Sequence, residues 1–155
     1  MKKIILLLLV TLLPSSINAE TILNKILTSG ELRVGTTGDW NPMTVKDPAS
    51  NEYKGFDIDV VAELAKDMSV TLKLVPTEWK TLVSGITSNK YDLSTSASLS
   101  AKRALATGYT ESYFTYSTLP LVNKKNISKF KDWDDFNKKN IKVAVTLGTV
   151  QEKMA

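Results

Sequence analysis

The sequence predicts an α/β fold in which helices cover a parallel sheet. Short runs with apolar residues at alternate positions predict strands, and segments with apolar residues at helical spacing follow them. Two strand–helix–strand units follow one another before residue 96, and such units are typical of parallel sheets. This fold class also predicts where a site would lie, because ligands of open α/β sheets bind beyond the carboxyl ends of the strands.

The first unit begins with a short helix. Apolar residues have helical spacing within 22–27, and Gly30 is suited to end the helix. Residues 31–36 predict a strand that leads into a loop containing glycine. Residues 46–52 contain Asp, Pro, Ser and Asn, so they predict a turn, which we interpret as the turn of a hairpin.

The second unit supplies two more helices and two more strands. A helix is predicted over residues 56–68, with Asp57 as the residue that caps it and with one apolar face. Alternating apolar residues predict a strand over 70–76. A helix over 78–89 and a third strand over 91–95 complete the parallel arrangement.

The pattern changes in the last third of the chain. Residues 112–122 are rich in β-forming residues, and residues 142–146 predict another strand. Gly148 and Thr149 predict the start of a further helix. From the length of the chain we expect one full domain and the beginning of a second, with the boundary within residues 116–125.

Residues 1–19 are typical of a signal peptide that directs export. Two lysines precede the apolar run of residues 4–13, and Ala19 is suited to signal-peptidase cleavage. The run is shorter than the roughly 20 residues that span a bilayer, which disfavours the alternative of an uncleaved anchor. The chain has no cysteine, so we expect neither lipidation nor disulfides, and no stable membrane insertion after cleavage.

Charge and composition exclude some classes of partner. The formal net charge is +4, and removal of Lys2 and Lys3 with the signal peptide leaves +2. The sequence has no basic stripe interleaved with aromatic residues, so we expect no nucleic-acid partner. We also expect no metal and no cofactor.

The stretch Ser94–Arg103 carries the first candidate site. It follows the third predicted strand, and a third helix is predicted from Ser100, which places Arg103 in its first turn. Hydroxyl groups and free backbone N–H groups at a helix start suit an oxyanion, and a guanidinium group can bind a carboxylate through two parallel hydrogen bonds. The alternative is a serine-rich loop that caps an ordinary helix, with Arg103 in solvent.

Two tryptophans are predicted at the same edge of the sheet. Trp40 follows the first strand, and Trp79 opens the helix after the second strand. Either indole could pack on an apolar or cationic group of a ligand. The alternative for each is ordinary core or loop packing, but three strand ends that deliver such residues together favour a site.

The order of these segments resembles a known family. LRVGTTGDWNP, YKGFDIDVVAELAKDM, EWKTLVSGITSNKYDLSTSASLSAKR and VAVTLGTVQE resemble the periplasmic solute-binding proteins of polar amino acid transporters, family 3, over residues 32–152. The resemblance implies a type II periplasmic binding protein-like fold of two α/β lobes that close over an amino acid. Residues 20–118 would form lobe 1, 119–125 the hinge crossover, and 126–155 an incomplete start of lobe 2.

The resemblance also implies a set of ligand-binding residues. Arg103 and the helix start at Ser100 would hold the α-carboxylate of the ligand, and two serines of the preceding loop would contact its carboxylate and ammonium groups. Val150 stands where the family commonly has a second threonine, so a hydroxyl donor is lost there. The complete set is Trp40, Trp79, Ser96, Ser98, Ser100, Arg103, Thr149 and Val150.

The function that this resemblance implies is capture of a small amino acid or related carboxylate. We expect a monomeric periplasmic protein that delivers its ligand to the permease of an ABC transporter. The acidic residue that receives the ligand's ammonium group in this family would lie beyond Ala155. We expect no catalysis from such a binding protein.

One alternative within the same fold is an enzyme. The TTGDW-P loop also resembles the periplasmic cyclohexadienyl (arogenate/prephenate) dehydratases, which need a general acid. Gln151 or Glu152 would stand at the position of that acid, with Asp39 as a candidate partner. The simpler interpretation is that Glu152 stabilises the first turn of a helix.

Overall fold

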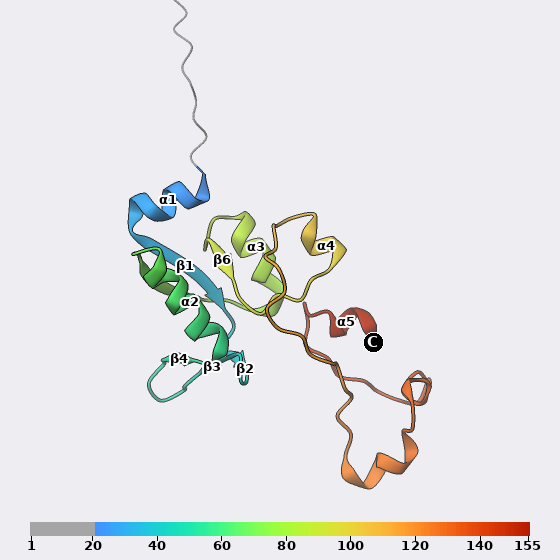
Figure 1. Cartoon of the computed structure of the whole chain (residues 1–155). Coiled ribbons are helices and arrows are strands. Elements are labelled where there is room, and N and C mark those ends of the chain that lie inside the picture. Colours follow the sequence, from blue (N-terminus) through green and yellow to red (C-terminus); the bar gives the residue numbers. More distant parts are fainter. Residues whose placement is uncertain (1–20) are drawn as a thin grey trace, which may run out of the picture.

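The computed structural model describes residues 21–155 (Figure 1). The signal-peptide prediction for residues 1–19 lies outside this range. The predicted α/β class is confirmed, because the larger sheet has three parallel strands in the order β5 (Thr71–Pro76), β1 (Glu31–Thr36) and β6 (Leu93–Ser94).

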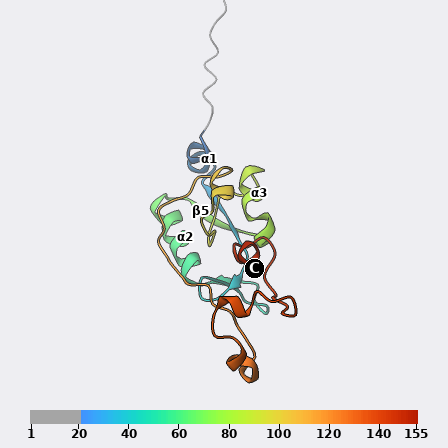
Figure 2. The same ribbon diagram turned by 90° about the vertical axis from the view of Figure 1, so that its right-hand side faces the viewer.

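Helices cover both faces of this sheet. The first helix, α1 (Ile22–Ser29), ends at Gly30, which adopts the left-handed conformation with φ 68°. Figure 2 shows α2 (Phe56–Asp67) and α3 (Leu82–Thr87) on opposite sides of the strands. A single 3₁₀ turn, η1 (Trp79–Thr81), precedes α3, so the helix that the sequence predicts over this region is shorter than expected.

The core lies where α1 and α2 pack on the sheet. Strand β1, the central strand of the sheet, is largely buried because neighbouring strands cover its edges and helices cover its faces. The buried core residues are Ile26, Leu32, Val34, Val61 and Ala65, packed against Met68, Val70, Leu72, Leu74 and Leu93. The alternation predicted for β5 is confirmed, since Leu72 and Leu74 point into this core.

Tyr91 anchors the third strand to α3. Its ring is buried against Gly35 of β1 and Gly85 of α3, where the Cβ of any larger residue would collide with the ring. Its hydroxyl donates a hydrogen bond to the carbonyl oxygen of Leu82 at 2.7 Å. The strand is shorter than the predicted 91–95, because only two residue pairs join β6 to β1.

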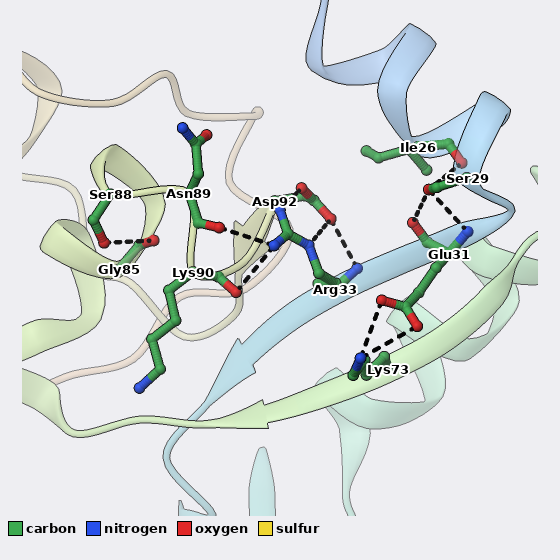
Figure 3. A network of polar contacts seen from close by, with 10 residues as sticks. All are labelled: Ile26, Ser29, Glu31, Arg33, Lys73, Gly85, Ser88, Asn89, Lys90 and Asp92. Atoms are coloured by element: carbon green, nitrogen blue, oxygen red, sulfur yellow. Dashed lines mark hydrogen bonds and ion pairs between the residues drawn. The ribbon is translucent and has the colours of Figure 1, made fainter.

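An ion pair connects the start of β6 to β1 (Figure 3). Arg33 donates to Asp92 from its backbone nitrogen and from Nε, both at 3.0 Å, and its Nη1 donates to the carbonyl oxygen of Asn89 at 2.8 Å. Burial alone would raise the pKa of Asp92, but the hydrogen bonds and charge of Arg33 hold that pKa below its ordinary value. This network fixes the strand whose carboxyl end leads to the predicted serine loop.

A small antiparallel sheet covers the end of β1. It consists of β2 (Asp39–Trp40), β3 (Thr44–Lys46) and β4 (Tyr53–Lys54), and the predicted hairpin joins the last two strands. The buried side chains of Thr36 and Thr44 share a hydrogen bond of 2.6 Å, which ties this sheet to β1. The first strand of the small sheet therefore lies at the carboxyl edge of the parallel sheet.

Two predicted strands are absent from the described residues. Residues 112–122 and 142–146 form no strand, and between them lie two 3₁₀ segments, η2 (Lys124–Lys129) and η3 (Trp133–Asp135), which extend from the sheet in Figure 1. A strand needs a neighbour that pairs with its backbone, and within residues 21–155 neither segment has one. High β propensity alone was therefore an insufficient signal.

Of the two short helices near the candidate site, one begins where the sequence predicts and the other does not. The predicted start of α4 (Ala101–Ala104) at Ser100 is confirmed, because Ser100 is its N-cap. The last helix, α5 (Gln151–Met154), begins after Val150, so the prediction that Gly148 and the following threonine open it is wrong. Among the described residues, no helix has the length and apolar character needed to cross a membrane.

Candidate functional site

A cavity of about 220 Å³ lies where the carboxyl ends of the parallel strands meet the last segment of the chain. Seven of the eight predicted ligand-binding residues line it, and Ser100 does not. The lining residues are Asp39, Trp40, Trp79, Ser96, Ser98, Arg103, Tyr116, Thr146, Thr149, Val150 and Gln151. The structure therefore brings together side chains from three strand ends and from the segment after residue 140.

Three aromatic rings form one wall of the cavity. Trp40 packs edge-on against Trp79, with ring centroids 6.0 Å apart and an interplanar angle of 71°. It also packs against Tyr116, at 5.2 Å and 69°. Tyr116 was not predicted from the sequence, although the aromatic residues of 112–122 were a signal that this segment packs against something apolar.

The indole of Trp79 is held by a carboxylate. Its Nε1 donates to both carboxylate oxygens of Asp39, at 2.9 and 3.1 Å. Asp39 is exposed, and within the described part of the chain no lysine or arginine forms an ion pair with it. The cavity therefore has a carboxylate that accepts from an indole and forms no ion pair with a described lysine or arginine.

Arg103 lies on another wall of the cavity and is half-buried. Its Nη1 donates to the carbonyl oxygen of Ser98 at 2.8 Å, and its Nη2 donates to the carbonyl oxygen of Gly148 at 2.9 Å. These contacts rule out the alternative of an arginine in solvent. A guanidinium group has five N–H donors, so donors remain for a ligand. Ser100 lies outside the cavity lining, and its Oγ accepts a hydrogen bond from the backbone nitrogen of Arg103, as its role as N-cap requires.

Close packing places the turn at Gly148 beside η1. Gly148 has φ 83°, and a Cβ on it would collide with backbone atoms of Lys80 in η1. The turn is closed by the hydroxyl of Thr149, which donates to the carbonyl oxygen of Thr146 at 2.7 Å. Residues with a Cβ rarely adopt this conformation, and a Cβ would not fit this close approach, so glycine lets the turn pack directly against η1.

The serine that faces the cavity from the strand end is held by a buried carboxylate. Asp57 is fully buried and accepts hydrogen bonds from the hydroxyls of Ser96 and, at 2.9 Å, Tyr113. The prediction that Asp57 caps α2 is wrong, because Gly55 is the N-cap and the Asp57 side chain turns toward the serine loop. Since the Ser96 hydroxyl donates to Asp57, it offers a ligand only lone pairs, which suit an N–H donor.

Partial burial also affects Tyr113, the tyrosine of this cluster. Desolvation and the adjacent Asp57 carboxylate raise the pKa of Tyr113 to about 12. Tyr113 therefore remains a neutral hydrogen-bond donor through the physiological range. Ser96 itself has φ 63°, so the chain turns out of the β6 direction at the residue that Asp57 holds.

Gln151 and Glu152, the two residues that could stand at the position of the dehydratase acid, have different surroundings. Gln151 lines the cavity, and its Nε2 donates to the hydroxyls of Tyr116 and Thr118 at 3.2 and 3.3 Å. Glu152 is not among the lining residues, and its Oε2 accepts a hydrogen bond from the backbone nitrogen of Gly148 at 2.7 Å. The residue in the cavity is thus an amide, which has no acidic proton to donate.

Comparisons with known proteins agree with this architecture. A model of the family described as bacterial extracellular solute-binding proteins, family 3, matches residues 32–153. The cyclohexadienyl dehydratase of Pseudomonas aeruginosa is 29% identical over 137 residues, which are 88% of this chain and 51% of that protein. The probable histidine-binding protein of Campylobacter jejuni is 32% identical over 139 residues, which are 89% and 51% of the two chains.

A solved structure has a similar fold over most of this chain. The ancestral amino acid-binding protein AncCDT-1, described as a precursor of cyclohexadienyl dehydratase, matches with a TM-score of 0.81 and 36% identity. The match covers 87% of this chain and 60% of the ancestral protein. The chain spans about half the length of the curated relatives it matches.

Proposed function

The chain belongs to the bacterial extracellular solute-binding proteins of family 3, and from this premise we propose that it binds an amino acid or related carboxylate. Its fold is that of type II periplasmic binding proteins, of which the chain covers about half. The ligand would occupy the cavity beside Arg103 and pass to the permease of an ABC importer. Export through the signal peptide would place the protein in the periplasm.

The observation that carries this proposal is the position of Arg103 in the cavity wall. Backbone carbonyl groups of Ser98 and Gly148 hold the guanidinium group in a fixed orientation. A guanidinium group that is already oriented loses little conformational freedom when it binds a carboxylate through its remaining donors. We therefore assign the ligand's carboxylate to Arg103.

The remaining predicted residues have roles that follow from this assignment. The lone pairs of Ser96 would accept hydrogen bonds from the ligand's ammonium group, because the Ser96 proton is used by Asp57. Trp40 and Trp79 would flank the ligand's side chain. The backbone at Thr149 and Val150 would close over the carboxylate, since both residues line the cavity from the side of the second lobe.

Lobe closure is the mechanism that fits these contacts. The cavity takes its walls from both ends of the chain, so a ligand that contacts both would favour the closed arrangement. Residues 119–125 connect the two sides and would form one hinge crossover. In this proposal the contacts of Arg103 to the turn at Gly148 form part of the closed state.

Calorimetric titration of the full-length protein with a panel of amino acids tests the proposal. Arg103→Ala should weaken binding by about 10- to 100-fold, the range expected for loss of a hydrogen-bonded charge. Lys102→Ala is the matched control, because Lys102 is an exposed neighbour outside the cavity. An Arg103→Ala protein that binds as tightly as the parent would refute the proposal.

The dehydratase function is a second candidate because one curated relative has that activity in its name. The reaction would expel water and carbon dioxide from prephenate or arogenate, and it needs a positioned acid. Glu152 bonds to a backbone nitrogen outside the cavity lining, so it is poorly placed for this role. Incubation with both compounds should give no turnover. Turnover that Glu152→Gln abolishes would instead establish the enzyme.

A further inference from the structure

We propose that Asp39 makes the cavity selective for amino acids whose side chain carries a positive charge. This inference rests on the proposed binding of an amino acid through Arg103, and it names the class of ligand. Among the side chains that line the cavity, Asp39 carries the negative charge and Arg103 carries the positive charge. A ligand that satisfies both must present an anionic group and a separate cationic group.

The hydrogen bonds of these two side chains keep their charges available. The guanidinium group of Arg103 donates to carbonyl oxygens, and Asp39 accepts from the indole of Trp79. Within the described residues neither side chain forms an ion pair with the other or with a third group. Closure of the cavity would remove water from Asp39, and a desolvated carboxylate without a counter-charge is unfavourable. A cation on the ligand supplies that counter-charge.

The aromatic wall favours the same group. Trp79 lies directly beside the Asp39 carboxylate, and Trp40 packs edge-on against it. The edge of Trp79 that carries Nε1–H meets Asp39, so a cation paired with Asp39 gains a second attraction where it extends over the face of either indole. A neutral polar side chain would gain neither attraction. The α-ammonium group has a different acceptor, the lone pairs of Ser96, which line the cavity beside Arg103.

Titration with arginine and citrulline tests the inference, because citrulline has nearly the same shape and no side-chain charge. The parent protein should bind arginine about tenfold more tightly, the combined effect expected of a partly exposed ion pair and one cation–π contact. Asp39→Asn should bring the two affinities together by weakening arginine alone. Asp67→Asn, which removes a charge from an exposed position outside the cavity, should preserve the preference.

A second variant separates charge from support of the indole. Trp79→Phe keeps an aromatic ring but removes the Nε1 donor to Asp39, so an electrostatic role predicts that the preference for arginine survives. Loss of that preference in Trp79→Phe, or equal weakening of arginine and citrulline in Asp39→Asn, would overturn the inference. If the parent protein binds arginine and citrulline equally tightly, the selectivity inference fails but the proposed function stands. Binding of no amino acid would overturn the proposed function as well.

Discussion

Loss of the carboxylate of Asp92 should destabilise the fold more than loss of any exposed charge. The Asp92 side chain is 3% exposed and that of Arg33 is 23% exposed, so their ion pair is nearly buried. Breaking a fully buried pair by removing one partner costs about 3–5 kcal/mol. Water reaches part of the guanidinium group, and Arg33 keeps its bond to Asn89, so we expect about 2–3 kcal/mol for Asp92→Asn.

Urea unfolding followed by tryptophan fluorescence measures this loss. In a separate thermal unfolding experiment, at roughly 2–4 °C per kcal/mol for a chain of this size, the midpoint should fall by about 4–12 °C. Glu31→Gln is the matched control, because its pair with Lys73 is 3.3 Å long and exposed (Figure 3). That variant should lose less than about 1 kcal/mol. Equal losses in the two variants would refute the reasoning.

The pH dependence of the same variant provides an independent check. The pKa of Asp92 is lowered in the folded protein, so its contribution to stability is complete above the ordinary aspartate pKa of about 3.9. The contribution is lost as the pH falls through the lower pKa of the folded state. The free-energy difference between the parent and Asp92→Asn should therefore shrink below about pH 4. A difference that stays constant to the end of acid unfolding would contradict this assignment.

Two further predictions concern residues that support the cavity from outside its lining. Burial and Asp57 raise the pKa of Tyr113 to about 12, so its contribution to stability is complete below about pH 10 and is lost as the pH rises through 12. Tyr113→Phe should remove one high-pH step from the ultraviolet titration, and an unchanged titration would exclude the buried contact. Gly148→Ala should strain the turn against Lys80 by about 1–3 kcal/mol and weaken ligand binding about tenfold. Gly108→Ala, where a Cβ meets nothing, is the control, and equal affinities would contradict the docking of the turn.

The sequence predicted the parallel sheet and most of the cavity because both depend on local patterns. Alternating apolar residues predicted β5, and the rule that ligands bind at carboxyl strand ends placed Trp40, Trp79 and Ser96 together. The position of Arg103 in the first turn of α4 followed from its spacing from the predicted N-cap, Ser100. Local sequence patterns are enough to predict these features, and only the order of the strands depends on contacts between distant residues.

The sequence could not reveal contacts between distant residues. Asp57 was interpreted as a cap because helix starts favour acids, but its partner Ser96 lies 39 positions away. The bond between Asp39 and Trp79 spans 40 positions, and no local pattern encodes it. Residues 112–122 have β propensity, yet within residues 21–155 no strand pairs with them, so propensity was overridden by tertiary context.

The indole resonances of the three tryptophans test the central claim most directly. Trp40 and Trp79 line the cavity, whereas Trp133 lies in η3 with 59% of its surface exposed. In a nitrogen-15 NMR titration of the full-length protein with an amino acid that binds, the resonances of the first two should shift saturably. The resonance of Trp133 should stay in place. Binding that leaves Trp40 and Trp79 unshifted would show that this cavity is not the site.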